Sequence, residues 1–256
     1  MTSAAPYILV VDDEQDTCAN LQDILTDLGY RVDVAYDGPS ALKLVEQHPY
    51  DVALLDLKMP GMDGLELYRR IKKLRAGTVA IVVTAYAASD IAEDVRQAGA
   101  FEILPKPVDL PRLLGLVDQV LDQPLVMVVD DDRELCDTLW DLLRDRGYRV
   151  CLAHSTAETR QRLKGREHQV VLIDMKLADE DGSAVFRLVH EMTPTARTIL
   201  ITGYRGELDR LVEQVLGEGA DAVSYKPFDV DKLLATIKEL AGKKWDSQYD
   251  GCRVER

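Results

Sequence analysis

The feature that most constrains the fold of this 256-residue chain is an internal repeat. The pair Asp12-Asp13 recurs 118 residues later as Asp130-Asp131. The same spacing of 118 residues relates Gly29-Tyr30-Arg31-Val32 to Gly147-Tyr148-Arg149-Val150, Asp56-x-Lys58 to Asp174-x-Lys176, Asp63-Gly64 to Asp181-Gly182, and Thr84 to Thr202. A period of this length is that of a whole domain and far exceeds a solenoid unit. The repeat therefore predicts a tandem duplication.

The spacing changes once, after Tyr204. Beyond it the repeats match at 120 residues, where Lys106-Pro107 aligns with Lys226-Pro227. Two residues are therefore inserted after Tyr204, in a loop or at the start of a helix. We expect one domain over residues 1–123, a second over 124–242, and a polar C-terminal tail over 243–256 that is too short to be a domain.

Each repeat alternates strand and helix patterns. Short apolar runs are separated by segments with apolar residues at helical spacing. In the first repeat the expected strands cover 7–11, 31–35, 52–55, 79–83 and 101–104, and the expected helices cover 14–28, 40–47, 64–74, 89–98 and 110–121. Continuous apolar strands between amphipathic helices are typical of a parallel sheet covered on both faces. The sequence predicts an α/β protein of two tandem (βα)5 doubly wound domains.

Composition excludes several classes of protein. The net charge of −14, from 31 basic and 45 acidic residues, argues against a nucleic-acid partner. No run of 18 apolar residues exists, which argues against a membrane span. The N-terminus lacks the basic region of a secretory signal, and the four cysteines form no CxxC pair. We expect a cytoplasmic protein.

Polar residues stand where the expected strands end. Asp12 and Asp13 follow the first strand, Asp56 the third, Thr84 the fourth and Lys106 the fifth. The carboxyl ends of neighbouring parallel strands open into one crevice. Three carboxylates there repel one another unless a cation is present, and an all-oxygen ligand set suits Mg²⁺. A carboxylate held beside a lysine can attack a phosphoryl group.

These motifs resemble the CheY-like receiver domain of two-component response regulators. The first repeat carries Asp12-Asp13, Asp56 followed by Met59-Pro60-Gly61-Met62-Asp63-Gly64, Thr84 and Lys106-Pro107; the second carries Asp130-Asp131, Asp174, Asp181-Gly182, Thr202 and Lys226-Pro227. The resemblance covers nearly the whole chain except the tail. It implies the flavodoxin-like receiver fold, twice.

The resemblance also implies a role for each motif residue. Asp56 and Asp174 would accept a phosphoryl group from a phosphohistidine. Mg²⁺ would be held by Asp12, Asp13, Asp56 and the backbone carbonyl of Lys58, and in the second repeat by Asp130, Asp131, Asp174 and the backbone carbonyl of Lys176. Thr84 and Thr202 would bind phosphoryl oxygens, and Lys106 and Lys226 would pair with the phosphoryl charge. The Lys-Pro bonds match a position that is cis in this family.

The implied function is a bacterial phosphorelay protein and not an enzyme in the usual sense. Its partner would be a sensor histidine kinase or a histidine phosphotransfer protein. No room for an effector domain follows residue 241, so output would pass through protein contacts to a downstream effector. One departure concerns switching: Ile103 and Val223 stand where receivers carry Tyr or Phe, and the nearest aromatics are Phe101 and Tyr225.

Two alternatives remain open. The chain is a receiver fragment of a larger hybrid kinase or regulator, or a haloacid-dehalogenase-like Mg²⁺ phosphatase. Phosphatases of that family place a second aspartate two residues after the nucleophile, where this chain has Lys58 and Lys176. Among the other polar residues, His48, His154 and His168 have no ligand spacing and are expected at the surface, and Cys18 and Cys136 are expected to serve packing.

Overall fold

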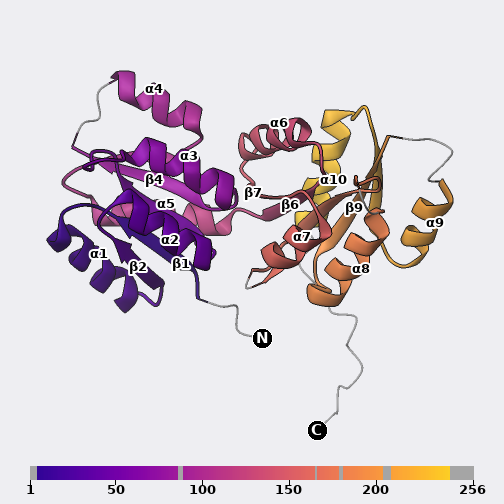
Figure 1. Cartoon of the computed structure of the whole chain (residues 1–256), viewed down its shortest axis with the longest axis horizontal. Coiled ribbons are helices and arrows are strands. Elements are labelled where there is room, and N and C mark those ends of the chain that lie inside the picture. Colours follow the sequence, from indigo (N-terminus) through magenta and orange to yellow (C-terminus); the bar gives the residue numbers. More distant parts are fainter. Residues whose placement is uncertain (1–4, 86–88, 165, 179–180, 204–208, 243–256) are drawn as a thin grey trace, which may run out of the picture. The chain divides into compact units, whose positions relative to one another are not determined.

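The fold consists of two parallel five-stranded sheets, one for each repeat (Figure 1). The computed structural model describes residues 5–85, 89–164, 166–178, 181–203 and 209–242. The strand orders are β2-β1-β3-β4-β5 and β10-β9-β8-β6-β7, so the two sheets share one topology. In each, the order reverses beside the first strand of the repeat, which is the doubly wound arrangement. The predicted α/β class and the duplication are confirmed.

The first sheet and its helices follow in strict alternation. Their bounds are β1 (Tyr7–Val11), α1 (Gln15–Asp27), β2 (Arg31–Ala35), α2 (Gly38–Gln47), β3 (Val52–Asp56), α3 (Gly64–Leu74), β4 (Val79–Thr84), α4 (Ser89–Ala98), β5 (Glu102–Pro105) and α5 (Leu110–Asp122). All five residues of β3 are buried, as expected for a strand with neighbours on both edges and helices on both faces.

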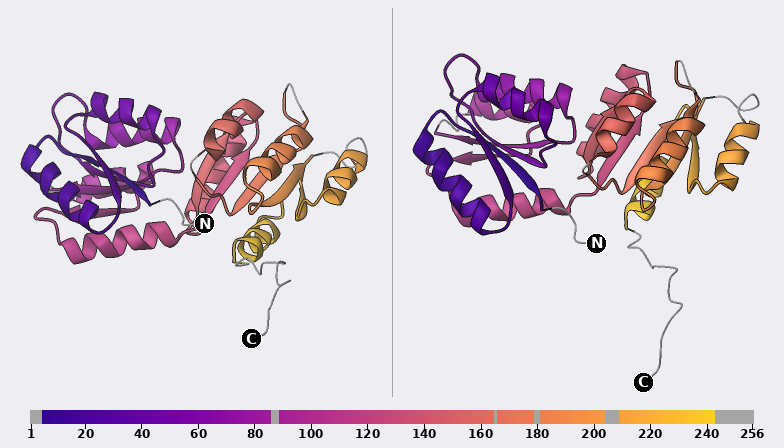
Figure 2. Two further views of the ribbon diagram at one scale, coloured as in Figure 1. Left: turned by 90° about the horizontal axis from the view of Figure 1, so that it is seen from below. Right: turned by 60° about the horizontal axis from the view of Figure 1, so that its bottom comes forward.

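Helices cover both faces of the first sheet (Figure 2). On one face the strand residues Leu9, Val11 and Leu55 pack with apolar residues of α2 and α3. On the other face Ile8 and Leu54, one position away in the same strands, pack with α1 and α5. Because successive strand residues point to opposite faces, the continuous apolar strands fill both layers.

Helix ends in this unit follow from the local sequence. The Asp109 side chain caps α5 by accepting from the N–H of Arg112, and Asp63 caps α3 in the same way. Gly29 has φ +91°, the left-handed conformation expected of a residue that follows a helix. Helix α2 begins two residues earlier than predicted because Asp37 caps it and accepts from Ser40. Strand β5 is shifted by one residue from the predicted range.

The second sheet repeats this order. Its elements are β6 (Leu125–Val129), α6 (Arg133–Arg144), β7 (Arg149–Ala153), α7 (Thr156–Leu163), β8 (Val170–Asp174), α8 (Gly182–Met192), β9 (Arg197–Thr202), α9 (Asp209–Gly217), β10 (Ala222–Tyr225) and α10 (Val230–Gly242). Helix α8 packs on β8 and contacts α7 and α9, and α10 also packs on β8.

Several predictions from the sequence are not tested by the structure. The two-residue insertion after Tyr204 and the polar tail over 243–256 lie outside the described residues. The domain boundaries at residues 123 and 242 stay predictions. Within the described part of the chain, none of the helices combines the length and the apolar character needed to cross a membrane.

Candidate functional site: a cluster of carboxylates and a lysine in each repeat

Three carboxylates meet at the carboxyl ends of β1 and β3. Asp12 and Asp13 directly follow β1, and Asp56 is the last residue of β3. Oxygen atoms of all three lie within 4.8 Å of one another. Asp12 and Asp56 are buried, whereas Asp13 is exposed. The sequence prediction that these side chains converge is confirmed in geometry.

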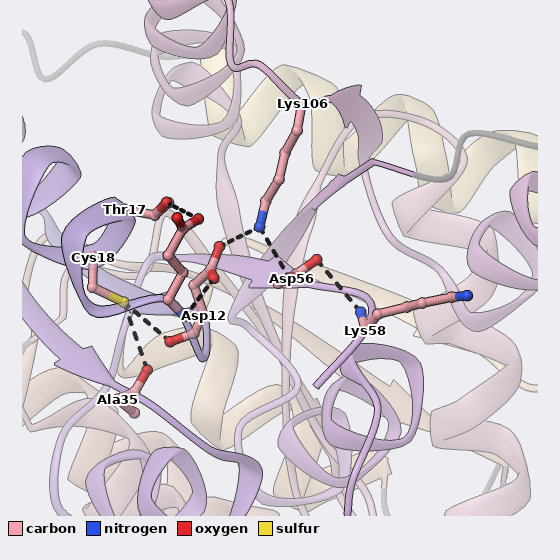
Figure 3. A network of polar contacts seen from close by, with 8 residues as sticks. Asp12, Thr17, Cys18, Ala35, Asp56, Lys58 and Lys106 are labelled. Atoms are coloured by element: carbon pink, nitrogen blue, oxygen red, sulfur yellow. Dashed lines mark hydrogen bonds and ion pairs between the residues drawn. The ribbon is translucent and has the colours of Figure 1, made fainter. Parts of the chain in front are cut away.

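Lys106 links two of these carboxylates, as Figure 3 shows. Its Nζ donates to Asp12 Oδ2 at 2.7 Å and to Asp56 Oδ2 at 3.1 Å. The other oxygen of Asp56 accepts from the backbone N–H of Lys58 at 3.4 Å. The charge of the lysine therefore lies directly against the carboxylate for which the sequence predicts phosphorylation.

Burial and the charge of the ion-pair partner have opposite effects on the pKa values of Asp56 and Lys106. Burial raises the pKa of Asp56, although Lys106 counteracts the shift and the nearby Asp12 charge adds to it. For Lys106, burial acts to lower the pKa, but the hydrogen bonds and charges of Asp12 and Asp56 outweigh it and raise the pKa. The lysine is thus firmly cationic, while the carboxylate ionises less readily than an exposed one.

The main chain around Asp12 holds its carboxylate in place. The N–H of Asp12 donates to the carbonyl of Ala35 at 3.2 Å, and the N–H of Glu14 donates to Asp12 Oδ1 at 3.0 Å. The Cys18 thiol donates to the Asp12 carbonyl at 3.3 Å (Figure 3). Cys18 is fully buried, so the predicted packing role holds, and the thiol also contacts the backbone of the site.

The second repeat builds the same cluster. Oxygen atoms of Asp130, Asp131 and Asp174 lie within 4.8 Å of one another, and only Asp131 is exposed. Lys226 Nζ donates to Asp130 Oδ2 and to Asp174 Oδ2, each at 2.7 Å. The backbone N–H of Lys176 donates to Asp174 Oδ1 at 3.1 Å.

In the second cluster the carboxyl group with a raised pKa is that of Asp130, the counterpart of Asp12. Burial raises the pKa of Asp130, against the opposing effect of Lys226 and with a contribution from the Asp174 charge. Burial acts to lower the pKa of Lys226, but its hydrogen bonds to Asp130 and Asp174 outweigh it and raise the pKa. The raised pKa of the lysine is common to both clusters, because each lysine lies between two carboxylates.

The remaining motif residues lie at the ends of the next strands. Thr84 and Thr202 end β4 and β9, and both are buried. The Lys106-Pro107 and Lys226-Pro227 peptide bonds are cis, as the resemblance implied. Ile103, which replaces the usual aromatic, packs against a small cluster of Leu57, Val82 and Val95.

Comparison with known protein families decides the identity of this arrangement. The profile described as "Response regulator receiver domain" matches residues 8–118 and again residues 126–238. The chain belongs to the response regulator receiver family. Its two receivers are modules of two-component signalling, and this family consists of phosphoacceptor signalling modules and not of classical enzymes.

Relatives resemble the chain over different lengths. A response regulator receiver protein from Anaeromyxobacter sp. (strain Fw109-5) is 36% identical over 233 residues, which are 91% of this chain and 94% of that protein. The transcriptional regulatory protein ZraR of Salmonella typhimurium is 37% identical over 114 residues, which are 44% of this chain and 26% of ZraR. A CheY-like receiver domain protein from Methanospirillum hungatei, known from its crystal structure, is 34% identical with a TM-score of 0.45, and the match covers 46% of this chain and 95% of that one.

One residue near the second receiver's cluster was missed from the sequence. His154 is half-buried, and its Nδ1 lies 2.9 Å from the carbonyl oxygen of Asp130, a contact that the prediction of a surface histidine did not include. The spacing of the histidines does not predict this contact, because the contact depends on how the end of β7 lies beside the end of β6. The same prediction of a surface histidine was wrong for His168, which is buried.

Proposed function

We propose that each receiver accepts a phosphoryl group on an aspartate, Asp56 in the first and Asp174 in the second. The observation that carries the proposal is the lysine Nζ placed against the buried carboxylate, at 3.1 Å in the first receiver and 2.7 Å in the second. The donor is a phosphohistidine on a sensor histidine kinase or a histidine phosphotransfer protein. Output passes to a downstream effector through protein contacts.

The transfer itself breaks and forms one bond. An oxygen of Asp56 attacks the phosphorus, the bond between phosphorus and the imidazole nitrogen breaks, and the electron pair returns to the imidazole. Lys106 stays beside the phosphoryl oxygens and offsets their charge, since its raised pKa keeps it protonated. The Thr84 hydroxyl, at the end of β4, supplies a donor to the same oxygens.

The acidic cluster fits a hard divalent cation. Three carboxylates with oxygens within 4.8 Å of one another form an all-oxygen donor set, and one of them is exposed at the mouth. Asp12, Asp13, Asp56 and the backbone carbonyl of Lys58 would hold Mg²⁺, as would Asp130, Asp131, Asp174 and the backbone carbonyl of Lys176. When bound, Mg²⁺ neutralises carboxylate and phosphoryl charge.

Two alternatives were left open by the sequence, a phosphatase and a fragment of a larger regulator. The first depends on the residue two positions after the nucleophile, and the second on how much of a relative the chain matches. A haloacid-dehalogenase-like phosphatase requires an acid two residues after the nucleophile, and Lys58 and Lys176 occupy those positions. The ZraR match supports the alternative that the chain is a receiver piece of a larger regulator, because the match covers 26% of ZraR. Under that alternative the phosphoryl chemistry stays the same and only the output differs.

Phosphate incorporation tests the proposal. The full chain is incubated with Mg²⁺ and a small acyl phosphate, and intact mass is measured for the wild type, Asp56→Asn, Asp174→Asn and the double variant. We expect two, one, one and no phosphoryl groups, respectively. Asp63→Asn is the matched control, because asparagine also caps a helix and Asp63 lies at the far end of the loop that follows Asp56.

The outcome also separates the receiver from a phosphatase. A receiver accumulates stoichiometric aspartyl phosphate, whereas a phosphatase consumes a large excess of the donor. Incorporation in the double variant at the wild-type level would contradict the assignment of Asp56 and Asp174.

A further inference from the structure

His154 connects the start of helix α7 to the acidic cluster of the second receiver. Its Nδ1 lies 2.9 Å from the carbonyl oxygen of Asp130. Because a carbonyl oxygen only accepts, the proton in this contact belongs to Nδ1. Asp130 is buried, and its carboxylate is one of the three that form the cluster.

The contact completes a clamp on the main chain of Asp130. The N–H of Asp130 donates to the carbonyl of Ala153 at 3.1 Å, and its carbonyl accepts from His154, the next residue of that strand end. The carboxylate is fixed separately by the N–H of Asp132 at 2.9 Å and by Lys226 at 2.7 Å. Every polar group of Asp130 is thereby oriented.

The backbone of His154 is held by residues at the start of α7. Glu158 Oε2 accepts from the backbone N–H of His154 at 3.1 Å. The N–H of Glu158 donates to Ser155 Oγ at 3.2 Å, so the Glu158 residue is bonded both to Ser155 and to the backbone of His154 directly before it. A helix cap thus fixes the backbone from which the imidazole reaches Asp130.

The first receiver has no imidazole donor to the carbonyl of Asp12 among its described contacts. The matching position is Tyr36, whose side chain is 45% exposed. There the carbonyl of Asp12 accepts from the Cys18 thiol at 3.3 Å, and a thiol is a weaker donor than an imidazole N–H. The imidazole donor to the cluster is therefore a property of the second receiver.

We propose that His154 is a positioning residue that orients Asp130 for cation binding in the second receiver. This inference rests on the proposed binding of Mg²⁺ by the cluster. Residues that hold a metal ligand in its binding orientation raise affinity without touching the metal, and their loss typically costs about tenfold or more in affinity. His154→Leu removes the donor at similar size.

The test uses the full chain with Asp13→Asn, so that Mg²⁺ titration reports the second cluster. Mg²⁺ affinity is measured by calorimetry for the protein with His154 intact and for the variants His154→Leu, His154→Asn and His154→Gln. The amide nitrogen of asparagine occupies the place of Nδ1, whereas that of glutamine lies one bond farther out. We expect about tenfold weaker binding for His154→Leu and His154→Gln, and nearly wild-type binding for His154→Asn.

Two controls separate positioning from folding. Tyr36→Leu, at the matching position of the first receiver, leaves the affinity of the second cluster unchanged. Urea unfolding without metal gives the stability of each variant, and the Asn–Gln difference in affinity persists at matched stability. Equal affinity of all three variants and the wild type overturns the role of His154. No Mg²⁺ binding even with His154 intact overturns the inference together with the proposed cation site.

Discussion

Gly64 lies so close to Asp56 that a β-carbon at position 64 would stand 2.2 Å from the carbonyl oxygen of Asp56. The N–H of Gly64 also donates to the carbonyl of Leu57 at 2.9 Å, which fixes the loop after β3 against the start of α3. Only glycine allows this approach, since the contact is with backbone and not with the end of a flexible side chain. The same relationship recurs at Gly182, where the distance to the carbonyl oxygen of Asp174 is 2.3 Å.

Gly64→Ala is therefore expected to displace the strand end that carries Asp56. We expect a loss of about 1–3 kcal/mol in the free energy of unfolding, measured by urea denaturation. Gly115→Ala in α5 is the control, because a β-carbon there meets no atom within 4 Å, and it should gain about 1 kcal/mol from helix propensity. A Gly64→Ala protein as stable as wild type would show that the loop relaxes freely.

Asp13→Asn should weaken Mg²⁺ binding to the first cluster, because it removes one of three carboxylate ligands and one charge. At 100 times the dissociation constant, a bound cation stabilises the folded state by about 2.7 kcal/mol, so the variant should lose its Mg²⁺-dependent thermal shift at that site. Asp131→Asn in the same chain removes the second contribution. Asp16→Asn, exposed on α1 and outside the cluster, should keep the full shift.

Asp56→Asn should stabilise the metal-free protein at neutral pH. Burial raises the pKa of Asp56, so the folded state binds its proton more tightly than the unfolded state does. Wild type therefore loses stability relative to the variant as pH rises from the ordinary carboxyl value, about 3.9, through the raised folded value.

Chemical denaturation in a chelator at a series of pH values measures this difference. The stability gap should be largest near pH 7 and should narrow as the pH falls towards 4. Asp23→Asn, exposed on α1, should show no such pattern. A wild type more stable than Asp56→Asn at pH 7 would mean that Lys106 overcompensates for the burial of the carboxylate.

Cys18 should resist alkylation while the protein is folded. Burial raises the pKa of its thiol to about 11, with a further contribution from the charge of Asp12, so the thiolate is rare at pH 8. In a variant whose other cysteines are serine, the rate of reaction with iodoacetamide should follow the rate or extent of unfolding. Fast labelling without denaturant would show that α1 opens locally.

Much of the fold was predictable from the order of residue types. Buried runs such as Leu54–Leu55 and the amphipathic helices after them predict parallel strands, because only a sheet covered on both faces needs apolar residues at every position. Helix ends were less predictable. Asp37 caps α2 through Ser40, yet an aspartate four residues before the first apolar residue of a pattern, here Ala41, is equally typical of a loop.

The sequence by itself determined that Asp12, Asp56 and Lys106 share one edge of a sheet, since each ends or directly follows a strand and parallel strands end together. Only the tertiary structure decided that Lys106 contacts Asp12 and Asp56, that Asp13 stays exposed, and that His154 reaches the carbonyl of Asp130. Periodicity reports which face of an element is buried. It carries no information on which two polar atoms, many residues apart, come within hydrogen-bond distance, because that depends on the packing of whole strands and helices.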